Sequence, residues 1–206
     1  MQRAPTGPSA DKSALRRYVL SGRAALPADR RSAAGAALAD ALLPLCGGAD
    51  SVAAYVGVGT EPPTAPLLAA LTGVRVLLPV LLPDGDLDWA EHEPDAPLLR
   101  SARGLLEPSG PRLGRDAVSG CDVVVVPALA ADRAGHRLGR GGGSYDRALP
   151  RARGLVVALL HDGELVETVP AEPHDVTVAA VATPALGLLR LDRASGPPEG
   201  FGRMGQ

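Results

Sequence analysis

Short, continuous apolar runs constrain the fold of this chain more than any other feature. The run DVVVV at residues 122–126 is β-branched after its first residue, and none of the runs alternates regularly between polar and apolar side chains. A strand with one face in water alternates, whereas a strand covered on both faces does not. The pattern therefore indicates a mainly parallel sheet buried under helices. The predicted strands are 51–58, 74–82, 122–126, 155–160 and 176–183.

Helices are predicted before and between these strands. Residues 12–26 follow Asp11, a suitable N-cap, and place Leu15 and Val19 at helical spacing. Glycine pairs and prolines mark where helical patterns stop. The other predicted helices are 33–45, ended by Gly47 and Gly48, then 64–71, and a stretch through Arg147 and Leu149.

Strands that alternate with helices predict an α/β fold, a three-layer α/β/α sandwich with a mostly parallel central sheet. With 206 residues the chain has the length of one domain, which we assign to residues 12–190. A flexible lead-in is expected at 1–11 and a flexible tail at 191–206. The segment 83–120 has Pro and Gly at short intervals, and we expect an irregular excursion there with a small hairpin near 87–91.

Charge and cysteine content exclude several classes of protein. Lys and Arg total 21 against 23 Asp and Glu, a net charge of -2, which provides no electrostatic footprint for nucleic acid or an anionic membrane. The two cysteines form no CxxC pair, which argues against structural zinc and a disulfide framework. No apolar stretch approaches about 18 residues. We expect a soluble, cytoplasmic protein, a monomer or weak homo-oligomer.

The segment 137–147, RLGRGGGSYDR, carries the most specific chemical signal. Its four glycines fall between a strand and a helix, where successive backbone N–H groups and the helix N-terminus can face one anion. Arg137, Arg140 and Arg147 add positive charge that suits phosphate. The loop matches neither the Walker A pattern nor the dinucleotide pattern, in which a third Gly would replace Ser144. A tight strand-to-helix turn without a ligand is the alternative interpretation.

Three carboxylates accompany this loop. If phosphates bind there, Asp146 would repel them unless a cation lay between, so the phosphate interpretation predicts Mg²⁺ held by Asp146 and a second carboxylate. Asp175 precedes the last predicted strand, and Glu61 follows the first strand, at the edge where open α/β sheets bind ligands. Without a ligand, Asp146 would complement the helix dipole, Asp175 would be a turn residue, and Glu61 would cap the next helix.

In this order the residues resemble the 5-formyltetrahydrofolate cyclo-ligase family, also called methenyltetrahydrofolate synthetases. The most specific part is RLGRGGGSYDRAL, preceded by VVVVPALAADRAGH. Further matches follow the family order across residues 12–184: Lys12 with Arg16, Glu61 with Thr64, Glu107 with Pro108, and His174 with Asp175 and Val176.

The resemblance implies a ligase that uses ATP and Mg²⁺ to close 5-formyltetrahydrofolate to 5,10-methenyltetrahydrofolate. It would release ADP and phosphate through a phosphorylated formyl intermediate. By position, Arg140 and Asp146 would be catalytic, and Asp146 and Asp175 would hold Mg²⁺. The folate would contact Glu61, Arg140, Gly141, Gly142, Gly143, Ser144 and Tyr145. ATP would contact Lys12, Arg16, Arg137, Leu138, Gly139, Arg140, Gly141, Gly142, Gly143, Ser144 and Tyr145.

This chain departs from the family pattern at Ser144, where an aromatic residue is usual, so one wall of the folate pocket is lost or supplied elsewhere. Trp89 could stack on a pterin, although packing is the favoured interpretation, and Tyr55 is expected in the core or the pocket wall. Two other functions stay open. One is an ATP-dependent enzyme acting on another pterin-like or thiamine-pathway substrate, and the other is a non-catalytic folate-binding protein.

Overall fold

A seven-stranded sheet forms the centre of the computed structural model, which describes residues 11–101, 104–172 and 175–191. Its strands are β1 (Ser51–Ala53), β2 (Arg75–Leu81), β3 (Leu87–Glu91), β6 (Val123–Pro127), β9 (Leu155–Leu159), β10 (Ala180–Thr183) and β11 (Gly187–Arg190). They lie in the order β11-β10-β9-β6-β1-β2-β3. Neighbours from β10 to β2 are parallel, and β11 and β3 are antiparallel at the two edges. The predicted α/β fold with a mostly parallel sheet is confirmed.

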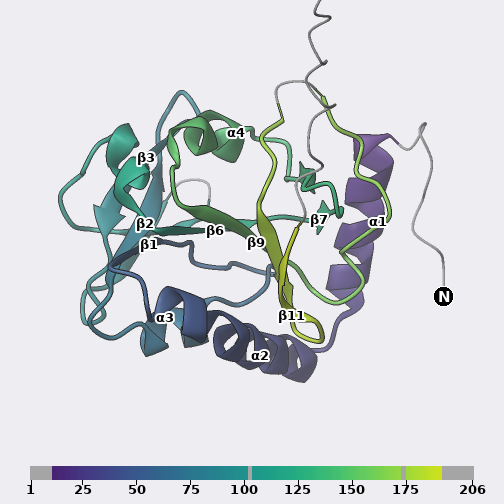
Figure 1. The fold of residues 1–206 in the computed structure, drawn as a ribbon, viewed down its shortest axis with the longest axis horizontal. Helices are drawn as coiled ribbons and strands as arrows, with labels where there is room; N and C mark the ends of the chain where they lie inside the picture. Colours follow the sequence, from purple (N-terminus) through teal and green to yellow (C-terminus); the bar gives the residue numbers. More distant parts are fainter. Residues whose placement is uncertain (1–10, 102–103, 173–174, 192–206) are drawn as a thin grey trace, which may run out of the picture.

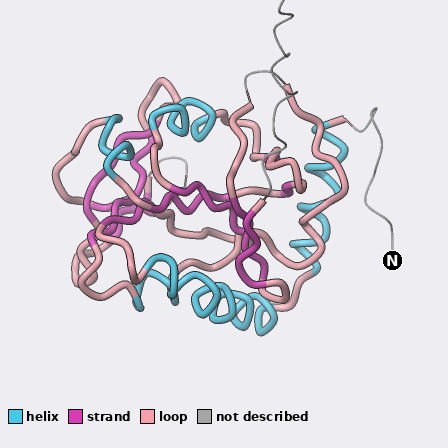
Figure 2. The backbone as a smooth tube through the Cα atoms, in the orientation of Figure 1, coloured by secondary structure: helices cyan, strands magenta, loops and turns pink. Residues whose placement is uncertain are grey.

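Helices cover both faces of this sheet. The described α-helices are α1 (Lys12–Ala25), α2 (Ala28–Cys46), α3 (Ala65–Ala70) and α4 (Ser144–Ala148), with short 3₁₀ helices η1 (Arg115–Gly120) and η2 (Leu149–Arg151). Figure 1 shows α2 and α3 below the sheet, α4 above it and α1 standing beside one end. Figure 2 shows how much of the chain between these elements is loop.

The side chains of β6 explain why its sequence does not alternate. Val123 and Val125 pack in the cluster that includes α2 and α3, whereas Val124 and Val126 pack in the opposite cluster with α4 and η1. All four are at most 3% exposed. Because each face of the strand meets a hydrophobic layer, an apolar residue is favoured at every position.

The local sequence favours the residues at which two helices begin. The Asp11 carboxylate accepts a hydrogen bond of 3.0 Å from the backbone N–H of Ser13, as expected for the cap of α1. Helix α2 begins at Ala28, earlier than the predicted residue 33, because Pro27 at its N-cap and Asp29 in its first turn both suit a helix start. The lead-in 1–11 and the tail 191–206 lie outside the described residues, except for Asp11 and Leu191.

The segment 83–120 is more regular than predicted. Residues 87–91 do belong to a hairpin, but their partner is β2, so they extend the main sheet as its edge strand. A separate hairpin pairs β4 (Leu98–Arg100) with β5 (Leu106–Pro108). Trp89 is 1% exposed and packs in the core, which confirms the packing interpretation.

Three predicted strands are shorter than expected. The first ends at Ala53 rather than residue 58, because the chain leaves the sheet there to form a loop. The fourth ends at Leu159, and the fifth forms strand only over residues 180–183. It is also not the last strand, since β11 turns back beside β10 through Gly187, whose φ is 68°. A further short pair, β7 (Ala130–Ala131) and β8 (Arg137–Leu138), was not predicted.

The strand order reverses between β1 and β6. From β1 the chain builds outward through β2 to β3, and it then returns to build β6, β9, β10 and β11 on the other side. In open α/β sheets, ligands bind in the crevice outside the carboxyl ends of the strands at this point. The fold therefore directs attention to the loops that leave β1 and β6.

Candidate active site

A cavity of about 560 Å³ lies at this reversal of the strand order. The chain leaving β1 lines it with Tyr55, Val56 and Glu61, and the chain leaving β6 lines it with residues 127–129. Leu105 and Leu106 add apolar surface to the cavity wall, and Leu106 is the first residue of β5. This hairpin supplies apolar surface in a pocket where Ser144 supplies no ring.

Every residue that the sequence predicts for the site lines this one cavity. These residues come from α1, from the loop after β1, from the glycine segment and from the chain before β10, which are far apart in the sequence. They are Lys12, Arg16, Glu61, Arg137, Leu138, Gly139, Arg140, Gly141, Gly142, Gly143, Ser144, Tyr145, Asp146 and Asp175. The structure brings these residues together in one cavity, and their individual roles stay predictions.

The glycine loop runs from β8 to α4, and two of its glycines are required by the backbone. Gly141 has φ 104° and Gly143 has φ 69°, values that residues with a side chain rarely adopt. The Arg147 side chain donates a 3.0 Å hydrogen bond to the carbonyl of Gly142. Because α4 has only five residues, the amides and arginines of the loop provide more of its attraction for anions than the helix dipole does.

Helix α1 reaches the loop through its first turns. Arg16 Nε donates a 2.9 Å hydrogen bond to the carbonyl of Gly139. Lys12 Nζ lies 2.7 Å from the Asp175 carboxylate and 3.3 Å from that of Glu172. Burial alone would lower the pKa of Lys12, but these two carboxylates outweigh it and raise the pKa. Lys12 therefore stays cationic at the cavity wall.

The carboxylate of Asp146 pairs with a buried guanidinium. Arg137 Nη2 lies 2.6 Å from Asp146 Oδ1, and Arg137 is only 7% exposed. Its Nε is buried and has no hydrogen-bond partner among the described residues. Arg137 Nε is therefore a buried hydrogen-bond donor at the cavity that no described residue satisfies.

The donor chemistry fits magnesium shared with a phosphate. Within the described ranges, no group of three or more His, Cys, Asp or Glu side chains could hold a metal ion. Mg²⁺ usually takes one or two protein carboxylates and completes its shell with phosphate oxygens and water. Asp146 and Asp175, which line the same cavity, supply that number of carboxylates.

Glu61 joins the loop after β1 to the glycine loop. Its Oε1 lies 3.1 Å from Arg140 Nε, and its Oε2 accepts a 3.1 Å hydrogen bond from the N–H of Val58. Glu61 does not cap the next helix, because Thr64 is the N-cap of α3 and makes no side-chain capping bond. Thr64 instead donates its hydroxyl to the carbonyl of Tyr55 at 2.6 Å, which ties the loop closed.

Sequence reasoning missed Arg23, which lines the cavity from the last turn of α1. Arg23 makes two hydrogen bonds to the carboxylate of Glu164, of 2.6 and 2.7 Å, and a third of 2.6 Å to the carbonyl of Ala128. Both side chains of the pair are less than a tenth exposed. In the sequence Arg23 is an ordinary basic residue near a helix end, so no local signal distinguishes it.

His161, which the sequence left without a role, continues this network toward Glu61. Its backbone N–H donates to Glu164 at 2.7 Å, and its Nε2 lies 3.1 Å from the carbonyl of Thr60. Burial lowers the pKa of His161, so the ring is neutral near pH 7. Because a carbonyl only accepts, Nε2 carries the proton and donates to Thr60, next to Glu61.

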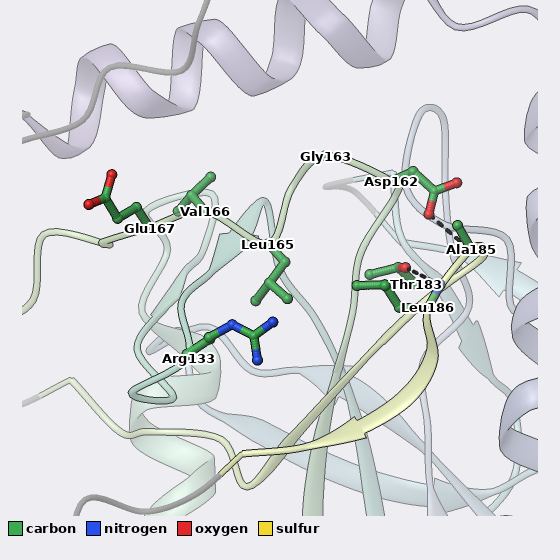
Figure 3. Close-up of a pocket in the computed structure, with 9 residues that line it drawn as sticks. All are labelled: Arg133, Asp162, Gly163, Leu165, Val166, Glu167, Thr183, Ala185 and Leu186. Carbon is green, nitrogen blue, oxygen red and sulfur yellow. Dashed lines mark hydrogen bonds between the residues drawn. The ribbon is translucent and has the colours of Figure 1, made fainter.

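A second cavity, of about 530 Å³, lies beside the loop that follows β9. Figure 3 shows the Arg133 side chain pointing toward the space below Leu165, while Glu167 points away from it. The Asp162 carboxylate accepts a hydrogen bond from the backbone N–H of Ala185, and the Thr183 hydroxyl accepts one from that of Leu186. None of the residues predicted for the site lines this cavity.

Fold and cavity together place the chain among the α/β proteins that have a cavity at the switch point of a mostly parallel sheet, here lined by several cationic side chains. The comparison with known proteins is more specific. The chain belongs to the 5-formyltetrahydrofolate cyclo-ligase family, whose model matches residues 8–184. The resemblance found in the sequence is thereby confirmed, and the family is one of enzymes.

Individual relatives agree with this assignment. A 5-formyltetrahydrofolate cyclo-ligase of Mycolicibacterium smegmatis is 42% identical over 189 residues, which cover 87% of this chain and 97% of that protein. The enzyme of the same name from Escherichia coli K12 is 36% identical over 144 residues, 66% of this chain and 79% of its own.

Solved structures show the same fold. The NMR structure of the 5,10-methenyltetrahydrofolate synthetase of Aquifex aeolicus superposes with a TM-score of 0.76 at 27% identity, covering 95% of this chain and 99% of that one. The Mycoplasma pneumoniae synthetase has a TM-score of 0.67 at 18% identity, which supports the fold alone.

No described helix is long and apolar enough to cross a membrane.

Proposed function

We propose that this protein uses ATP and Mg²⁺ to close 5-formyltetrahydrofolate to 5,10-methenyltetrahydrofolate, with release of ADP and phosphate. The observation that carries the proposal is the ion pair of Arg140 and Glu61, because it joins the glycine loop to the loop after β1 inside one cavity. A nucleotide on the glycine loop and a folate on Glu61 would then be neighbours. Family membership supports the choice of both substrates.

The formyl oxygen must become a leaving group before the ring can close. In the proposed reaction this oxygen attacks the γ-phosphorus of ATP and ADP departs. N10 then attacks the formyl carbon, its proton is lost, and the C–O bond breaks to release phosphate. Such a transfer depends chiefly on alignment and on neutralising charge, so arginines and a glycine loop suit it better than a nucleophilic side chain.

Each cation that the sequence predicts for the site has a proposed task. Lys12 and Arg16 would bind the phosphates together with Arg137 and the loop amides, while Arg140 would bridge the γ-phosphate and the formyl oxygen. Asp146 and Asp175 would hold Mg²⁺. When bound there, the ion would supply charge neutralisation at the phosphates. The present partners of these carboxylates, Arg137 and Lys12, would be released toward the phosphate oxygens.

Formation of the methenyl chromophore tests the proposal. The purified protein is incubated with 5-formyltetrahydrofolate, ATP and Mg²⁺, and absorbance and ADP are followed together. We expect both products in equal amounts, and neither when ATP or Mg²⁺ is omitted. Failure to form the chromophore at high enzyme concentration would contradict the proposal.

The same assay separates the two other functions that the sequence left open. ADP release with a different pterin-like or thiamine-pathway compound, but not with 5-formyltetrahydrofolate, would favour the related enzyme. Folate binding without any Mg²⁺-dependent affinity for ATP, measured by calorimetry, would favour the non-catalytic binding protein.

A cytoplasmic location and a monomeric or weakly oligomeric state are also proposed.

A further inference from the structure

Two tyrosine hydroxyls lie in the cavity without a hydrogen-bond partner. Tyr55, just beyond β1, is 4% exposed, and Tyr145 comes from α4 on the opposite side of the strand order's reversal. Both line the cavity. Each hydroxyl oxygen is buried, and neither has a partner among the residues that the structure describes.

A buried hydroxyl without a partner lowers the stability of a folded protein. Phenylalanine at either position would fill the same space without this cost. Tyr18 provides a comparison. It is only partly buried on α1, and it does have an interaction partner. Of the three tyrosines in the chain, the two that line the cavity are thus the two whose hydroxyls have no partner among the described residues, which points to a ligand that supplies the missing hydrogen bonds.

The surroundings of the Tyr55 hydroxyl define its protonation. Burial raises the pKa of Tyr55, and the nearby negative charge of Glu61 raises it further. This phenol is therefore neutral at physiological pH and has a proton to donate. The ligand must offer acceptor atoms at this point of the cavity.

Charge decides which part of a ligand would meet them. Of the cations for phosphate, Arg16 reaches the glycine loop from α1 and Lys12 pairs with Asp175, whereas the tyrosines lie within the field of the Glu61 carboxylate. A phosphate in direct contact with that carboxylate, rather than with its partner Arg140, would be repelled. A neutral heterocycle with both N–H donors and ring acceptors would satisfy the carboxylate and the phenols together.

We infer that Tyr55 is a specificity-determining residue whose hydroxyl donates a hydrogen bond to an acceptor atom of the reduced pterin ring, with Tyr145 as a second donor. The inference rests on the proposed function, since it takes the folate as the ligand beside Glu61. It assigns to Tyr55 a polar contact, where the sequence alone predicts only core or wall.

The test compares Tyr55→Phe with the wild type in equilibrium binding and in thermal unfolding. The dissociation constant for 5-formyltetrahydrofolate should rise about 3- to 10-fold, the range of one neutral hydrogen bond. The dissociation constant for ATP with Mg²⁺ should not change. The Tm of the protein without ligand should stay equal or rise, because an unsatisfied buried hydroxyl is removed.

Tyr18→Phe is the matched control, because it removes the same atom from a tyrosine that does not line the cavity. It should leave folate affinity unchanged. A Tm decrease in Tyr55→Phe with folate affinity unchanged would overturn the inference, since the hydroxyl would then be a structural group. Equal losses of folate and ATP affinity would also overturn it.

Binding and turnover keep this inference separate from the proposed function. If the wild type binds 5-formyltetrahydrofolate but forms no methenyl product, the proposed function fails while the Tyr55→Phe comparison still decides the inference. If the wild type does not bind 5-formyltetrahydrofolate at all, both are wrong.

Discussion

The guanidinium of Arg23 and the carboxylate of Glu164 form a buried pair through two hydrogen bonds of 2.6 and 2.7 Å. The two residues are 141 positions apart in the sequence. Their pair fastens the last turn of α1 to the loop after β9, and Arg23 also holds the carbonyl of Ala128 beyond β6. One side chain thus connects three of the segments that surround the cavity.

Breaking this pair should strongly destabilise the protein. Arg23→Met leaves Glu164 charged and buried, with an expected loss of about 3–5 kcal/mol in the free energy of unfolding. Urea denaturation measures the loss. The control is Arg75→Ala, which removes an exposed ion pair with Glu91 and should cost less than about 1 kcal/mol. Similar losses in the two variants would show that burial does not govern the Arg23 pair.

Replacing His161 should weaken folate use through the loop that carries Glu61. His161→Ala removes the hydrogen bond to Thr60, so the KM for 5-formyltetrahydrofolate should rise about 10-fold with little change in the KM for ATP. His161→Gln keeps an N–H donor near the Nε2 position and should restore most of the affinity. His92→Ala is the control, because the buried Nδ1 of His92 has no hydrogen-bond partner among the described residues, whereas His161 contacts the loop that carries Glu61. Equal KM values for the Ala and Gln variants would contradict a positioning role.

Stability should fall as the pH falls below about 6.5. Burial lowers the pKa values of His161 and His92 in the folded protein, whereas the unfolded chain keeps the ordinary value. Between the two values the unfolded state binds more protons, so acid favours unfolding. Urea midpoints measured from about pH 7.5 to pH 5 should decline less steeply in His161→Gln. Parallel slopes would show that His161 does not contribute.

Removing the charge of Asp146 should impair turnover more than stability. Asp146→Asn can still accept a hydrogen bond from Arg137, so the protein should fold with a lowered thermal midpoint, because the buried guanidinium loses its opposing charge. The kcat should fall about 100-fold or more if the carboxylate holds Mg²⁺. The Mg²⁺ concentration for half-maximal rate should rise as well. The control is Asp116→Asn, whose carboxylate is exposed on η1. Normal activity in Asp146→Asn would remove this residue from the metal site.

The four glycines of the loop should differ in their response to alanine. Gly141→Ala places a side chain at φ 104° and should destabilise the protein by about 1 kcal/mol or more, as should Gly143→Ala. At Gly142 the φ is not positive, and a Cβ would meet only the Ser144 hydroxyl oxygen, 3.8 Å away. Gly142→Ala should therefore leave the thermal midpoint unchanged. Equal losses at Gly141 and Gly142 would contradict this distinction.

The sequence predicted the sheet well where burial leaves a local pattern. Strand β6 has valine at four consecutive positions because both of its faces are covered, and the sequence of residues 122–126 shows this pattern directly. The edge strands β3 and β11 are less visible, since their pairing depends on turns that bring them back beside β2 and β10. Pairing of this kind is decided by tertiary contacts rather than by local composition.

The site was predictable through its motifs and not through its supporting contacts. The glycine loop, Lys12, Arg16, Glu61 and Asp175 all line the cavity, as their family order predicts. Arg23 and Glu164 escaped notice because each lies in an unremarkable local sequence and meets its partner only after folding. Tyr55 was placed correctly at the wall, but only its unsatisfied hydroxyl distinguishes a wall residue from a donor.

The position of α1 beside the sheet has a consequence for the order of assembly on the ribosome. This helix is synthesised well before its partners, since Lys12, Arg16 and Arg23 contact residues that lie 163, 123 and 141 positions later. The helix cannot dock until those segments have emerged, because its binding partners do not exist before then. The cavity is consequently completed only after Asp175 has been synthesised, when α1 closes against segments made much later.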